Sequence, residues 1–100
     1  MIVRAFDTAV EAPDLERGKE LFRTVVRPAF ESFPGCHGIE MLVGIDEHSK
    51  DLIEIVAISR WDSQQAIDAA VSSDDYEEAL REIRKLFQQT PLVRHFEAIE

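Results

Sequence analysis

One uninterrupted run, residues 52–61, constrains the fold of this chain more than any other part of its sequence. It reads Leu-Ile-Glu-Ile-Val-Ala-Ile-Ser-Arg-Trp, is dense in β-branched residues and contains neither glycine nor proline. This composition predicts a long, well-buried β-strand. Asp62, with Gln65 three residues later, then forms a capping-box-like start for a helix. We therefore expect a candidate site at this junction of strand and helix, beside Trp61.

Three further strands are predicted from short apolar runs, over residues 2–7, 39–45 and 92–99. The polar stretch 46–51 separates the second of these strands from the long central run. A link this short between two long strands predicts an antiparallel hairpin. His48 lies at its tip, where we expect a solvated turn residue.

The first predicted helix opens at Pro13-Asp14 and carries apolar residues at spacings of three and four as far as Phe33. Phe22 and Val26 belong to this apolar stripe, which is wide enough to cover one face of a sheet. Pro28 lies inside the stripe and has no backbone N–H. We expect the helix to kink or break there.

The second predicted helix begins at Asp62 and is interrupted by the polar stretch 72–75. Ser73 or Asp74 can cap its second segment, and Thr90-Pro91 stops it. The element order is thus strand, helix, two strands, helix, strand. This order predicts one ferredoxin-like α+β domain over residues 1–100, with an antiparallel βαββαβ sheet and both helices on one face.

The predicted sheet is apolar on both faces, although the two helices cover only one of them. Leu52, Val56 and Ile58 alternate with an equally apolar set on the other side of the same strand. Burying each such side chain is worth about 1.5–3 kcal/mol. We therefore expect a homodimer in which two sheets pack face to face, or else a monomer with an unusually apolar surface.

Charge and cysteine content narrow the class of protein. Acidic residues outnumber basic ones by 20 to 11, which gives a formal charge of −9. Such a surface repels phosphate backbones and anionic lipids, so we expect neither nucleic acid nor membrane as a partner. The single cysteine, Cys36, and the absence of an N-terminal signal pattern favour a cytoplasmic protein.

Three local motifs resemble those of the antibiotic biosynthesis monooxygenase (ABM)-like family. Residues 33–40, Phe-Pro-Gly-Cys-His-Gly-Ile-Glu, resemble its PGC-x-G-[FY]-E entry to the second strand. Residues 59–67 resemble its x-x-W-x-S-x-x-A-[FL] junction, and residues 72–76 resemble its x-S-x-x-[FY] helix break. The resemblance implies a dimeric α+β barrel whose protomers each hold an apolar pocket between helices and sheet.

The family's activities differ, and the resemblance separates them only in part. Some members oxygenate aromatic polyketides or quinols without metal or flavin, and others degrade haem. The haem-degrading branch uses a tryptophan at the junction, which Trp61 matches, together with a strand-one asparagine and a second-helix histidine. Those two positions fall near Asp7 and Leu80 here, so haem degradation is disfavoured.

Several side chains are candidates for chemistry, each with a structural alternative. The Trp61 indole N–H can donate to a substrate oxygen, or the ring can be a core anchor. His95 can act as a base near neutral pH, or be a satisfied edge-strand residue. Asp7 can accept a proton, or cap a turn. Tyr76 can offer its phenol to a ligand at the pocket mouth, or be the first core position of its helix segment.

The function that these features favour is a small monooxygenase acting on an aromatic phenol or quinol. Trp61, His95 and Asp7 are the catalytic candidates, and Tyr76, Phe22 and Val26 the substrate-binding ones. We expect no metal, because Cys36 and the histidines show no ligand grouping. We also expect no cofactor, because the sequence contains no Gly-rich phosphate loop and no dinucleotide fingerprint. The alternative is a non-catalytic dimer that binds an apolar or aromatic small molecule in the same pocket.

Overall fold

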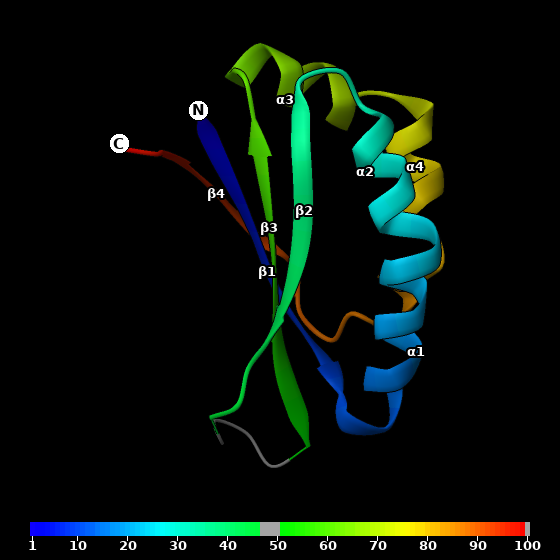
Figure 1. The fold of residues 1–100 in the computed structure, drawn as a ribbon. Helices are drawn as coiled ribbons and strands as arrows, with labels where there is room; N and C mark the ends of the chain where they lie inside the picture. The colour runs from blue at the N-terminus through cyan, green and yellow to red at the C-terminus, as the bar shows by residue number, and fades with distance from the viewer. Residues whose placement is uncertain (47–50, 100) are drawn as a thin grey trace.

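A computed structural model describes residues 1–46 and 51–99 and contains a four-stranded, wholly antiparallel sheet (Figure 1). The strands are β1 (Ile2–Glu11), β2 (Cys36–Val43), β3 (Leu52–Trp61) and β4 (Leu92–Glu97). Their order in the sheet is β2-β3-β1-β4. This arrangement confirms the predicted ferredoxin-like α+β fold. The turn expected around His48 lies outside the described residues.

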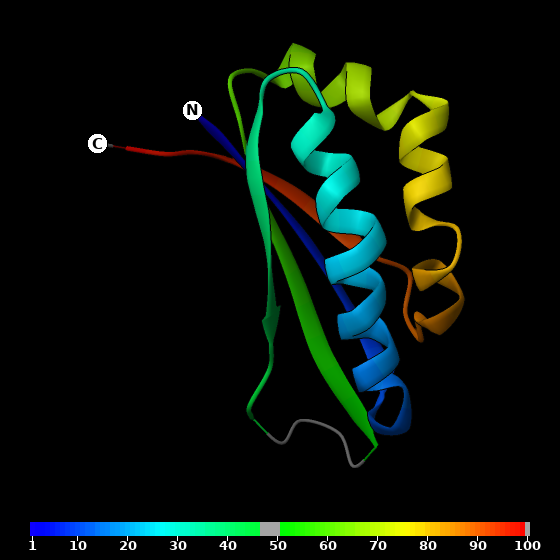
Figure 2. The ribbon, with the colours of Figure 1, turned by 45° about the vertical axis from the view of Figure 1, so that its right-hand side comes forward.

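The helices all cover one face of the sheet (Figure 2). The helices between β1 and β2, which we call the first helical layer, are η1 (Ala12–Asp14), α1 (Leu15–Leu21), η2 (Phe22–Val26) and α2 (Arg27–Ser32). The helices between β3 and β4, which we call the second helical layer, are α3 (Gln64–Val71), α4 (Asp74–Leu80) and η3 (Ile83–Leu86).

The first helical layer changes its hydrogen-bonding pattern where a break was predicted. Pro28 lies in the first turn of α2 and cannot donate to the carbonyl four residues earlier. Just before it, Phe22–Val26 form a π-helical stretch. The chain stays helical through the proline, so the predicted kink or break takes the form of a π-bulge.

Serine side chains cap the two segments of the second layer. The Ser63 hydroxyl accepts a hydrogen bond from the Ala66 amide at 3.2 Å, so Ser63 rather than Asp62 caps α3. The Ser73 hydroxyl accepts a hydrogen bond from the Tyr76 amide at 3.2 Å, so Ser73, rather than Asp74, caps α4. These caps fix where Tyr76 enters the core.

β1 is longer than predicted, running to Glu11 rather than ending at Asp7. Two polar residues, Asp7 and Thr8, follow the predicted apolar run, and their side chains lie on opposite faces of the longer strand. The buried Thr8 hydroxyl donates to the Gln89 carbonyl at 2.9 Å, which satisfies it inside the protein. β4 is shorter than predicted and ends at Glu97.

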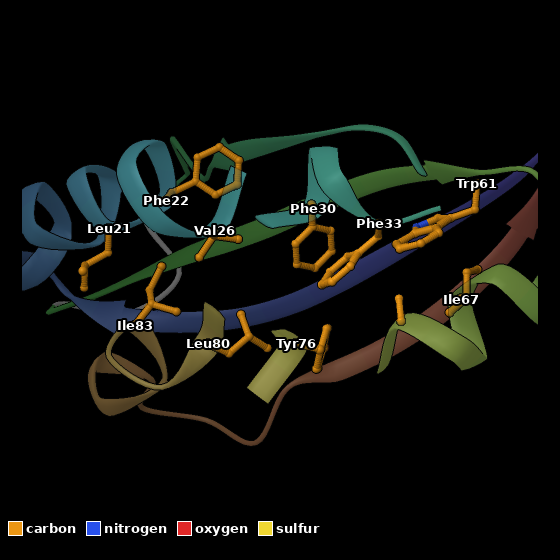
Figure 3. Close-up of a cluster of buried hydrophobic side chains, with 11 residues drawn as sticks. Leu21, Phe22, Val26, Phe30, Phe33, Trp61, Ile67, Tyr76, Leu80 and Ile83 are labelled. Atoms are coloured by element: carbon orange, nitrogen blue, oxygen red, sulfur yellow. The ribbon is translucent and has the colours of Figure 1, made fainter. Parts of the chain in front are cut away.

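The register divides the sheet into two unlike faces. The helix-side face contributes alternate residues of β1, including Arg4 and Phe6, to the interior. The opposite face, which we call the outer face, presents exposed Leu42, Leu92 and Phe96 together with partly buried neighbours. Figure 3 shows the helix-side core, whose aromatic end is formed by Phe30, Phe33 and Trp61 and whose other end lies around Phe22 and Ile83.

Candidate functional site

A cavity of about 40 Å³ lies between the helices and the sheet. At roughly 10–15 Å³ for each water molecule, it has room for about three waters. Its walls come from all the layers of the fold, and their side chains are almost entirely apolar. The lining residues are Arg4, Phe6, Thr8, Val10, Gly18, Phe22, Val26, Phe30, Ile39, Met41, Ile55, Ala57, Tyr76, Leu80, Ile83 and Phe87.

Arg4 and Tyr76 form the polar part of this cavity. Arg4 projects from β1 and Tyr76 from the first turn of α4. The Arg4 Nη2 atom donates to the Tyr76 hydroxyl oxygen at 2.9 Å, and both side chains are about 95% buried. The bond therefore joins the sheet to the second helical layer through the interior.

The charge of the Arg4 guanidinium is not balanced by an acid. Among the described residues, Arg4 takes part in no ion pair, and its Nε is buried without a hydrogen-bond partner. Its guanidinium carbon lies 5.6 Å from the ring centroids of both Phe6 and Tyr76, which supply cation–π attraction. An arginine stays charged at any physiological pH. The cavity wall thus carries a full positive charge, and the Nε donor of that group is unused.

The remaining polar lining residue is already satisfied, and the lining contains no base. Thr8 donates to the Gln89 carbonyl, as described above. No aspartate, glutamate or histidine is among the lining residues. The cavity can therefore bind and polarise an oxygen atom of a ligand, but none of its own side chains is a carboxylate or an imidazole that could take a proton.

Trp61 lies in the packed core rather than in the cavity. Its side chain is 1% exposed, and its indole Nε1–H donates to the Ser59 hydroxyl at 2.8 Å. The ring stacks against Phe33 at 6.3 Å and meets Phe30 edge-on at 6.1 Å (Figure 3). The space expected beside Trp61 is thus filled by aromatic rings, and its N–H is committed to Ser59.

The two predicted base candidates lie apart from each other and outside the cavity lining. Asp7 pairs in register with Val56 and Leu92 and points to the outer face of the sheet. His95 lies directly opposite Arg4 in the β1–β4 ladder, so it shares the helix-side face. β4 is exposed along its whole length, and His95 is in contact with solvent.

The three predicted substrate-binding residues come together at the cavity. Tyr76, Phe22 and Val26 all contribute to its lining, although they come from α4 and the π-helical stretch. Arg4, the charged residue of the cavity lining, is not among the candidates that the sequence suggested. The signal that could have indicated it is a cation that shares one strand face with the apolar residues Ile2 and Phe6.

No group of three or more metal-ligating side chains occurs among residues 1–46 and 51–99. In the same ranges, no helix is long and apolar enough to cross a membrane. Cys36, at the start of β2, is partly buried, and this burial raises the pKa of its thiol. A thiol with a raised pKa is a poor nucleophile near neutral pH.

Comparison with known proteins identifies the family to which this chain belongs. The geometry above defines a class of protein, namely a compact α+β fold with an apolar pocket between helices and sheet. The family model described as "Antibiotic biosynthesis monooxygenase" matches residues 1–82. The chain belongs to the antibiotic biosynthesis monooxygenase family. A comparison with curated protein sequences gives no match.

Solved structures show the same fold at low sequence identity. A putative antibiotic biosynthesis monooxygenase from Nitrosomonas europaea superposes with a TM-score of 0.80 at 14% identity, covering 100% of both chains. One from Deinococcus radiodurans has a TM-score of 0.72 at 17% identity, covering 100% of this chain and 94% of its own. SnoaB of Streptomyces nogalater, a cofactor-independent oxygenase solved as a point mutant, has a TM-score of 0.69 at 15% identity, with 99% and 94% covered.

Proposed function

We propose that this protein is a cofactor-independent monooxygenase whose substrate is an electron-rich phenol or quinol bound in the cavity beside Arg4 and Tyr76. The observation that carries the proposal is the unbalanced Arg4 guanidinium in an otherwise apolar wall. Membership of the family and the likeness to a cofactor-independent oxygenase support the class of reaction.

The proposed chemistry uses molecular oxygen as its only oxidant. For an anthrone-type substrate, loss of a proton gives an enolate, which transfers an electron to O₂ and then combines with the reduced oxygen. The ring CH₂ becomes a carbonyl carbon, one oxygen atom enters the product, and the other leaves as water. Positive charge fixed in a water-poor cavity stabilises the anion on which this sequence depends.

The Tyr76 hydroxyl has a defined place in this scheme. Its oxygen accepts the bond from Arg4, and its own O–H proton is donated to no acceptor within the described part of the chain. That proton is available for an oxygen atom of the substrate. Arg4 polarises the hydroxyl through the shared hydrogen bond and thereby strengthens its donation.

The substrate must displace side chains in order to enter. An engineered cavity of about 150 Å³ is the size at which a benzene ring is known to bind, and this cavity is about 40 Å³. Phe22 lies in the π-helical stretch, where the hydrogen bonding is already irregular. We propose that this stretch is the part of the wall that yields.

The outer face of the sheet supports a second component of the proposal, namely a homodimer. Val56 and Ile58 are only half-buried, while Leu42, Leu92 and Phe96 are exposed on the same face. A second copy that packs its own sheet here would remove this apolar surface from water.

An oxygen electrode tests the proposed activity. Purified protein with chelator present should consume O₂ when given hydroxylated naphthalenes or anthrones, and Tyr76→Phe should slow that consumption about tenfold or more, because it removes a donor to the developing oxyanion. Absence of oxygen uptake across the panel would refute the oxygenase.

A non-catalytic binding protein is the second candidate function. The specific observation that favours it is the lack of any carboxylate or histidine among the cavity-lining residues. Binding of aromatic ligands to the same cavity without oxygen uptake would establish this alternative.

A further inference from the structure

We propose that the cavity selects ligands that carry a negative charge, so that the substrate is bound as a phenolate, enolate or carboxylate rather than as a neutral ring. The inference rests on the proposed function for the ligand's aromatic body, and it adds the ligand's charge and its route of entry.

The first argument concerns the Arg4 guanidinium. Transfer of a cation into an apolar interior is unfavourable unless an opposite charge or enough acceptors meet it. Arg4 is 5% exposed, yet it donates one hydrogen bond to a neutral phenol, and its Nε is buried without a partner. An anionic oxygen in the cavity would supply the missing acceptor and the missing charge together.

The second argument concerns the proton balance of the site. A phenol must lose a proton before it becomes electron-rich enough to reduce O₂, and the lining residues include no base. A fixed cation instead favours the ionised form of a bound phenol, with the proton leaving to solvent. The charge of Arg4 thus promotes the loss of the substrate proton, a step for which the sequence suggested His95 or Asp7 as the base.

The third argument concerns a groove next to the cavity. A depression of about 190 Å³ is lined by Lys19, Phe22, Arg23, Arg27, Glu40, Met41 and Val43. It shares Phe22 and Met41 with the inner cavity, so those two side chains form the partition between them. The groove brings together three basic side chains and one acidic one, on a chain whose net charge is −9.

The basic side chains of this groove are largely uncommitted. Lys19 pairs with Glu16, whereas Arg23 and Arg27 take part in no ion pair among the described residues. The Arg27 guanidinium carbon lies 5.1 Å from the centroid of the Phe22 ring, on the partition itself. A local positive field on an acidic protein attracts anions to this position and repels cations. We therefore assign the groove as the entrance to the cavity.

Matched aromatic probes test the charge selectivity by isothermal titration calorimetry. 2-Naphthoate and 2-naphthylmethanol have the same ring system and differ in charge. Wild-type protein should bind naphthoate about tenfold or more tightly, the ratio that corresponds to a charge-assisted hydrogen bond of about 1.5–3 kcal/mol. Arg4→Met should remove this preference, while Arg81→Met, which changes an exposed arginine at the end of α4, should keep it.

Entry through the groove is tested by stopped-flow measurement of naphthoate association. Arg23→Met with Arg27→Met should lower the association rate constant and flatten its dependence on salt, with a smaller effect on dissociation. Arg4→Met should act mainly on dissociation. If Arg4→Met does not fold, Arg4→Lys keeps the charge but loses the guanidinium geometry, and should retain a weakened preference for the anion.

The outcomes separate this inference from the proposed oxygenase. Arg4-dependent preference for naphthoate without oxygen uptake from any phenol would refute the oxygenase and support the anion site. Equal affinity for the two probes, no binding of either, or a preference that survives in Arg4→Met would overturn the inference, whatever the oxygen electrode shows.

Discussion

Replacing Arg4 by methionine should make the unliganded protein more stable. Methionine matches the aliphatic part of the arginine side chain and carries no charge. The change removes a desolvated cation, whose burial costs several kcal/mol, and an unpartnered Nε, which costs about 1–3 kcal/mol. It also loses the bond to Tyr76, worth about 1.5–3 kcal/mol, and two cation–π contacts of about 0.5–2 kcal/mol each.

The balance of these effects favours methionine by about 1–2 kcal/mol, within the range measured when buried charges are replaced by apolar groups. For a domain of this size, we expect the Tm to rise by about 4–8 °C for each kcal/mol. Urea unfolding followed by Trp61 fluorescence and scanning calorimetry both measure the change. Arg81→Met, at an exposed site, should alter stability by less than about 0.5 kcal/mol.

A double-mutant cycle with Tyr76→Phe makes this test sharper. In wild-type protein, Tyr76→Phe leaves the Arg4 guanidinium without its hydrogen-bond partner and should lower stability by about 1.5–3 kcal/mol. In the Arg4→Met background the same change should be nearly neutral. If Arg4→Met instead lowers the free energy of unfolding by about 2 kcal/mol or more, the guanidinium is a structural element and the reasoning about an unused charge is wrong.

Four other perturbations test separate parts of the account. Trp61→Phe should lower stability by about 1–3 kcal/mol, because the Ser59 hydroxyl loses its buried partner. The same variant should keep its ligand affinity in calorimetry, and a large loss of affinity would show that Trp61 belongs to the binding site. Gly35→Ala should lower stability in urea by more than about 1–2 kcal/mol, because φ is +82° and the new Cβ would lie 2.7 Å from the Ala66 Cβ; a neutral result would contradict that geometry. Iodoacetamide should alkylate Cys36 more slowly in the folded protein than in urea at pH 8, because burial raises the thiol pKa, and equal alkylation rates would contradict that burial. For the same reason, the free energy of unfolding should fall as pH rises from the ordinary thiol pKa through the raised one. Ile58→Lys should convert a dimer into a monomer in light scattering, and a wild-type protein with the mass of one chain would exclude the dimer.

The fold could be predicted from the sequence because the apolar pattern of each element indicated its type, and the order of the elements along the chain indicated the topology. The β3 run carried enough β-branched residues to be assigned at both ends, and its bounds are those predicted. The errors lie at element ends, where the decisive interactions are not local. The Thr8 hydroxyl is satisfied by the carbonyl of Gln89, which lies near the other end of the sequence, so the residues around Asp7 do not show that Thr8 can be buried in a longer β1.

The candidate site was predicted less well, for a physical reason. Tyr76, Phe22 and Val26 followed from helical spacing, which fixes the face that each helix turns inward. The place of Trp61 depended on whether neighbouring side chains fill the space beside it, and Phe30 and Phe33, from another part of the chain, do so. The sequence shows Arg4 as a cation on the same strand face as Ile2 and Phe6, without indicating that this face is the inward one. Its lack of an acidic partner, however, is a property of the packed interior that the sequence does not contain.

Nuclear magnetic resonance of the two buried side-chain N–H groups tests most directly whether the ligand occupies the Arg4 cavity. Arg4 lines the cavity and its Nε–H has no protein partner, whereas the Trp61 indole N–H is bonded to Ser59 in the aromatic core. On titration of ¹⁵N-labelled protein with 2-naphthoate, the Arg4 resonance should shift strongly while the Trp61 indole resonance shifts little. A strong shift at Trp61 with Arg4 unchanged would contradict the account.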